Sequence, residues 1–69
     1  MIKVLIQYEI YRYTLECLDL GIFDVGKTLD DLFNSFQEAL ELYNEAMNKN
    51  YKLSDCKFIL LNLKGVKND

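Results

Sequence analysis

The sequence predicts an α+β fold of element order β-β-β-α-β, with one helix packed on one face of a sheet. Apolar and polar residues alternate in three segments before Gly26, as they do in half-buried strands. After Thr28 the apolar residues recur every three or four positions, as they do on one side of a helix. An apolar run at residues 57–63 then predicts a final strand.

The first two predicted strands are residues 2–10 and 13–17. In the first, every even position is apolar or aromatic, and in the second the odd positions are. Tyr11 and Arg12 supply a short reversal between them, although neither is a glycine or an asparagine. The two strands are therefore predicted to pair antiparallel.

Residues 22–25 are the third predicted strand, and residues 21–28, which include this strand, also match the bare P-loop pattern GxxxxGK[ST]. A glycine stands five positions before Gly26, and Lys27 and Thr28 follow it. A P-loop belongs to a far larger α/β domain, and an interior of Ile, Phe and Val favours sheet pairing over phosphate binding. We therefore interpret Gly26 as the residue that permits a bend, Lys27 as exposed and Thr28 as a helix cap.

Thr28 precedes a predicted helix that runs to about Asn48. Asp31, three positions after Thr28, completes a pattern that resembles a capping box with Asp in place of Glu. A right-handed crossover through this helix places the last strand parallel to the first, which predicts the strand order 3-2-1-4. The helix packs on the sheet through one apolar stripe, which comprises Leu29, Leu32, Phe33, Phe36, Leu40, Tyr43 and Met47.

A single helix covers one face of the sheet, so the other face is predicted to be an apolar partner surface. The last strand has apolar residues on both faces, and the pattern leaves open whether its contact pair is Phe58 and Leu60 or Ile59 and Leu61. We assign the first pair. The predicted contact residues from the strands and turns are Leu5, Tyr11, Leu18, Phe58 and Leu60.

One side of the predicted helix is acidic. Glu38, Glu41 and Glu45 lie along it, and Asp30 and Asp31 extend it toward the helix start. The common interpretation of such a pattern is a solvated helix face. The functional interpretation is a negative surface that binds a basic protein.

Length and charge restrict the class of protein. The 69 residues fit one domain, residues 1–69, whose core is so small that a partner or further copies usually stabilise it. We therefore predict a homodimer or a larger homo-oligomer. The formal charge of −3 argues against direct binding of nucleic acid. No apolar run suits a signal peptide or a membrane span, so we expect a cytoplasmic protein.

The sequence offers little for catalysis or metal binding. The chain has no histidine, and Cys17 and Cys56 are far apart, so we expect two buried free thiols, no metal and no cofactor. Glu9 and Glu16 have the opposite parity to the core residues of their strands and point away from the helix. Because they do not converge with Asp19 or Asp24, we expect a protein that is not an enzyme.

The run "YTLECLDLGIFDVGKTLDDLFNSFQEALELY" resembles the N-terminal domain of the HicB antitoxin family. The shared features are a Tyr-Thr second strand, an Ile-Phe third strand, the Gly-x-Thr joint at Gly26 and Thr28, and acids at Asp30 and Asp31. The resemblance covers residues 2–47 and extends to the last strand. It implies a partial RNase H-like fold without catalysis, which binds and occludes a small HicA toxin, a basic mRNA interferase.

Two departures from the family pattern restrict what the resemblance implies. The Pro-Asp-Leu-Pro-Gly turn of many members is "LDLG" at residues 18–21, which is similar to the shorter relatives. Full-length antitoxins continue into a DNA-binding domain, and none follows Leu63, so we expect no operator binding. The alternative hypotheses are an orphan HicB-like homo-oligomeric module and a phage-type inhibitor of another host protein.

Overall fold

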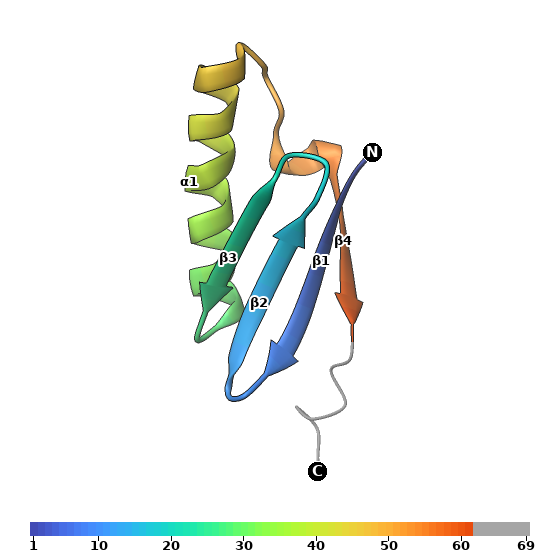
Figure 1. Ribbon diagram of the computed structural model, residues 1–69, viewed down its shortest axis with the longest axis vertical. Helices are drawn as coiled ribbons and strands as arrows, with labels where there is room; N and C mark the ends of the chain where they lie inside the picture. The colour runs from blue at the N-terminus through green and yellow to red at the C-terminus, as the bar shows by residue number, and fades with distance from the viewer. Residues whose placement is uncertain (62–69) are drawn as a thin grey trace.

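The computed structural model describes residues 1–61 and contains one four-stranded sheet with one long helix (Figure 1). This architecture confirms the predicted β-β-β-α-β order. The predicted end of the last strand at Leu63 and the polar tail at residues 64–69 lie outside the described residues. The elements are β1 (Ile2–Glu9), β2 (Arg12–Cys17), β3 (Ile22–Gly26), α1 (Leu29–Met47), the 3-10 helix η1 (Leu53–Asp55) and β4 (Cys56–Leu61).

The strand order in the sheet is β3-β2-β1-β4, as the crossover argument predicted. β1 pairs antiparallel with β2, and β2 pairs antiparallel with β3. β4 returns after α1 and pairs parallel with β1, with Ile2 opposite Cys56 and Ile6 opposite Leu60. β1 and β2 are therefore the central strands, and β3 and β4 form the two edges.

The core lies between the sheet and α1. α1 runs mainly over β3 and β2, so the β4 side of the sheet receives less cover from the helix (Figure 1). The predicted helix stripe contributes its central members to this core, and both cysteines are buried in it as predicted. The buried residues are Val4, Ile6, Leu15, Cys17, Ile22, Leu32, Phe36, Leu40 and Cys56.

The turn between β1 and β2 lies one residue earlier than predicted. Its two residues are Ile10 and Tyr11, with φ angles of 51° and 63°, and Arg12 already belongs to β2. A positive φ at both positions suits the right-handed twist of a two-residue hairpin. It is rare for a β-branched residue such as Ile10, so no residue preference identified this turn in the sequence.

The start of α1 confirms the predicted cap and corrects the predicted role of Gly26. The Thr28 Oγ1 accepts a hydrogen bond of 3.1 Å from the backbone N–H of Asp31. Gly26 does not have the positive φ that a bend requiring glycine would show; among the described glycines only Gly21 does, at 69°. Gly26 is needed for a close approach, because a Cβ there would lie 2.8 Å from the backbone N of Leu32.

One asparagine side chain holds the connection from α1 to β4. The Asn44 Nδ2 donates to the backbone O of Tyr51 at 2.8 Å, and the backbone N–H of Tyr51 donates to Asn44 Oδ1 at 3.0 Å. Both polar groups of the Asn44 side chain therefore form hydrogen bonds with the backbone of Tyr51. This contact anchors the returning chain to α1 just before η1 and β4, which orients β4 for its parallel pairing with β1.

Candidate protein-interaction surface

The face of the sheet opposite α1, here called the open face, carries a mixture of apolar and polar side chains. No helix among the described residues covers it. The strand register places Leu5, Glu16 and Phe23 in one row across this face. The side chains that the strands direct to the open face are Lys3, Leu5, Gln7, Glu9, Arg12, Thr14, Glu16, Phe23, Val25, Lys57, Ile59 and Leu61.

A shallow hollow of about 480 Å³ lies at one end of the open face. Leu5, Leu18, Ile59 and Leu61 make it apolar, and Leu18 is 67% exposed. Charged residues complete its lining: Lys3, Glu16 and Asp19. The backbone N–H of Lys3 donates to Asp19 Oδ2 at 3.3 Å, so the turn after β2 is tied to the start of β1. Leu5 and Leu18, two predicted contact residues, thus lie together in the hollow.

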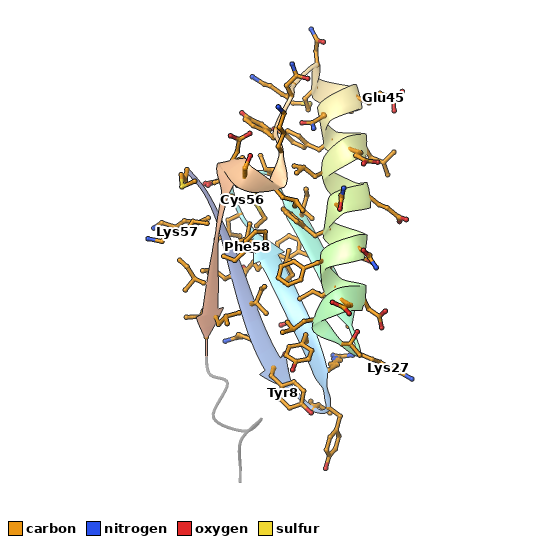
Figure 2. All side chains as sticks on the ribbon, turned by 180° about the vertical axis from the view of Figure 1, so that it is seen from behind. Tyr8, Lys27, Glu45, Cys56, Lys57 and Phe58 are labelled. Atoms are coloured by element: carbon orange, nitrogen blue, oxygen red, sulfur yellow. The ribbon has the colours of Figure 1, made fainter. Side chains whose placement is uncertain are left out.

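The prediction that Phe58 and Leu60 lie on the uncovered face is wrong. Phe58 pairs with Val4 and Leu60 with Ile6, and both partners face α1. Figure 2 shows Phe58 pointing toward α1 and Lys57 pointing away from it. The alternative pair, Ile59 and Leu61, lies on the open face instead.

Phe58 is part of the packed layer between β4 and the helix. Its ring lies edge-on to the rings of Phe33 and Phe36, with centroid distances of 5.1 and 6.0 Å. Leu60, two residues later on the same side, reaches beyond the cover of α1 and is 54% exposed. The register of β4 against β1 decides which face Phe58 and Leu60 lie on. The sequence of β4 does not reveal that register, because its residues are apolar on both faces.

Tyr11 is exposed, but it lies at the tip of the β1–β2 hairpin and not in the hollow. Tyr11 is therefore separate from the predicted contact residues Leu5 and Leu18, because it belongs to the turn, where it lies near Arg12 and Val25. Phe23 and Val25 are exposed on the open face of β3 and were not predicted as contact residues. In the sequence, Phe23 and Val25 alternate with the inward residues of β3, and this alternation could have predicted their place on the open face.

The acidic side of α1 faces solvent, with Glu38, Glu41 and Glu45 all exposed. Figure 2 shows Glu45 projecting away from the sheet. Leu42 lies within this acidic side and is 68% exposed, a feature that the apolar stripe did not predict. Within residues 1–61, no helix is long and apolar enough to cross a membrane. The acidic side of α1 is therefore a negative surface that includes the exposed Leu42.

Asp24 faces the helix side of the sheet, where the sequence did not predict a charge. It pairs with Leu15 across β2 and β3, and so shares the face of the core residues. Its Oδ2 is buried, and no hydrogen-bond partner among the described residues reaches it. Burial raises the pKa of Asp24 above the ordinary value of 3.8, and the Glu38 carboxylate raises it further.

Asp24→Asn is expected to raise the melting temperature at pH 7. Because the folded state raises the pKa of Asp24, it binds the proton more tightly than the unfolded chain does, so the ionised carboxylate destabilises the fold at neutral pH. This penalty decreases as the pH falls through the folded pKa and is absent below 3.8.

Thermal denaturation of Asp24→Asn and the wild type should therefore show a difference at pH 7 that shrinks toward pH 4. Glu9→Gln, a change at an exposed site outside the core, serves as the control and should leave the melting temperature unchanged at both pH values. A difference for Asp24→Asn that is independent of pH would contradict the assignment of the penalty to ionisation.

The cysteines and acids do not form a metal-binding cluster in the described part of the chain. Burial raises the pKa of both Cys17 and Cys56, which keeps the two thiols protonated at neutral pH. Glu16 lies on the open face and Asp24 on the helix face, so these carboxylates do not converge. Within residues 1–61, no cluster of three or more His, Cys, Asp or Glu side chains could hold a metal ion.

The segment that matches the P-loop pattern is strand and turn, not a phosphate-binding loop. Residues Ile22–Gly26, which would form the interior of such a loop, are β3 and pair with β2. Their backbone is extended and paired with β2 on one side, so their amides do not converge on one point as the amides of a phosphate cradle do.

Comparison with known proteins returned no match: no family model, no curated protein and no solved structure is similar to this chain.

Proposed function

We propose that this protein is a non-catalytic binding module that acts like the core of a HicB-type antitoxin and neutralises a small basic mRNA interferase by direct contact. The observation that carries the proposal is the hollow on the open face, where apolar Leu5, Leu18 and Ile59 lie beside the acids Glu16 and Asp19. An exposed apolar patch with a polar rim is typical of a protein contact.

The charge distribution supports a basic partner. The chain carries a formal charge of −3. The exposed side of α1 is acidic, and in the hollow two acids, Glu16 and Asp19, accompany one base, Lys3. Complementary charge accelerates association and disfavours acidic competitors, whereas apolar contacts in a pocket slow dissociation. We therefore assign the first role to the α1 carboxylates Glu38, Glu41 and Glu45 and the second to the hollow.

The experiment uses the product of a neighbouring reading frame that encodes a short basic protein with a histidine. Expressed alone it should stop growth, and co-expression of the present protein should restore growth and yield a co-purifying complex. If no neighbouring product is toxic or binds to the purified protein in titration calorimetry, the proposal fails.

Two variants separate the assigned roles in that complex. Glu41→Lys should lower the association rate at low salt by about 10-fold, with a weaker salt dependence, because it reverses a charge on α1. Leu18→Lys should mainly raise the dissociation rate, because it puts a charge into the apolar hollow. Glu9→Lys makes the same charge change outside the hollow and outside α1, at the other end of β1, and is the control. Equal effects of Glu9→Lys and Glu41→Lys would contradict the role given to α1.

A further inference from the structure

The two edges of the sheet differ in a way that bears on self-association. The outer strands are β3 and β4, and an edge strand presents unpaired backbone N–H and C=O groups that can pair with another chain. Proteins commonly protect such edges with edge lysines, inward-pointing charges, a covering helix, bulges, proline or very short edge strands. β3 and β4 differ in these protective features.

The β3 edge is protected. Asp24 points inward from it, with a buried Oδ2 that lacks a hydrogen-bond partner among the described residues. A second strand added beside β3 would remove more water from this carboxylate, which costs free energy. α1 also runs over β3 and narrows access to the helix-facing side.

The β4 edge is less protected in the described part of the chain, where its one charged residue is Lys57, near the start of the strand. Its residues from Phe58 to Leu61 are all apolar, and no described strand pairs with its outer side. Leu60 lies in the same row across the sheet as Ile6, Leu15 and Asp24, so one end of this row is a charge and the other an apolar side chain. Leu60 is 54% exposed although it lies on the helix side of the sheet.

We propose that β4 pairs antiparallel with β4 of a second copy of this chain, which joins two four-stranded sheets into one continuous sheet. The two-fold axis is perpendicular to the sheet and passes beside Ile59. Such an axis keeps both helices on the same face, and it makes the contact self-complementary. This dimer does not depend on the proposed toxin-binding function.

The residue pairs that this register produces favour a second copy of the chain as the partner of β4. Phe58 lies opposite Leu60 of the second copy on the helix side, so each exposed leucine gains an apolar neighbour between the two helices. On the open face Ile59 meets Ile59 of the second copy. Lys57, the one charged residue of β4, lies opposite Leu61 of the second copy and not opposite another lysine, which avoids like-charge repulsion.

The contact is small, so the dimer should depend on protein concentration. Five paired residues span about 17 Å. A contact of this length buries less area than a standard interface, which buries about 800 Å² per partner. The hollow lies partly on Ile59 and Leu61, so the dimer brings two hollows to either side of the seam between the sheets.

Light scattering coupled to gel filtration, over about 1 to 500 µM protein, tests the dimer. The molar mass of the wild type should rise from that of one 8.1 kDa chain to twice that value. Leu60→Lys should remain monomeric throughout this range. Val25→Lys is the matched control, because Val25 is also 54% exposed and lies on the opposite edge strand, and it should dimerise like the wild type. Circular dichroism verifies that both variants fold.

Cross-linking tests the strand pairing itself. Ile59→Cys should form a covalent dimer under mild oxidation, because the two new thiols meet at the axis, whereas the native cysteines are buried and unreactive. Val25→Cys should form little covalent dimer under the same conditions. A wild type that stays monomeric at the highest concentration overturns the proposal. A dimer that survives Leu60→Lys, or that Ile59→Cys does not capture, also overturns it.

Discussion

Phe36→Ala is expected to lower the free energy of unfolding by about 3–5 kcal/mol, because it removes a fully buried aromatic ring and leaves a cavity. Phe36 lies at the centre of α1 and contacts the Phe58 ring of β4. The substitution therefore weakens the packing of the helix and of the edge strand together. Small domains have total stabilities of about 5–15 kcal/mol, so the variant should be largely unfolded at modest urea concentrations.

Urea denaturation followed by circular dichroism measures this effect. Leu42→Ala, a truncation on the exposed side of the same helix, is the matched control and should change the free energy of unfolding by less than about 0.5 kcal/mol. A loss below about 1 kcal/mol for Phe36→Ala would show that the site can collapse around the missing ring, contrary to the described packing.

Gly26→Ala is expected to lower the free energy of unfolding by about 1–3 kcal/mol. The added Cβ would lie 2.8 Å from the Leu32 backbone N, 3.1 Å from its Cα and 3.2 Å from the Thr28 backbone O. Because these atoms are backbone, no side chain can rotate to make room. The first turn of α1 must move away from β3, which disturbs both the Thr28 cap and the buried Leu32.

Gly21→Ala provides the comparison for Gly26→Ala. A Cβ at Gly21 meets no atom within 4 Å, but the backbone φ of 69° strains any residue other than glycine by about 1 kcal/mol. Urea denaturation of both variants separates steric overlap from backbone strain. If Gly21→Ala were the more destabilising of the two, the close approach of helix and strand at Gly26 would not be the dominant constraint.

The sequence predicted the elements of this fold well because their local signals are strong. Alternation identified β1 to β3, and the helical period identified α1. Thr28 was predicted correctly as the N-cap of α1. The parallel return of β4 followed from chain geometry and not from any residue. Local propensity, periodicity and crossover handedness agreed with one another in these segments, and agreement of this kind is what makes a fold predictable.

The candidate surface was less predictable because it depends on contacts between distant segments. Phe58 and Ile59 are both apolar, and only the register of β4 against β1 decides which of them faces α1. The inward position of Asp24 opposes the usual preference for solvent, so periodicity assigned it no role. Gly26 was recognised as special, but its reason, contact with Leu32, is a property of packing.

The parallel pairing of β1 with β4 also has a consequence for how the chain is made. β1 is synthesised first and lies in the middle of the sheet, yet one of its two neighbours is the last described strand. Until β4 leaves the ribosome, β1 exposes a free edge that includes the buried residues Val4 and Ile6 on one side. Such non-local pairing slows folding and leaves an incomplete sheet open to other nascent chains. The interval between synthesis of α1 and of β4 is therefore when this protein is most exposed to misassembly.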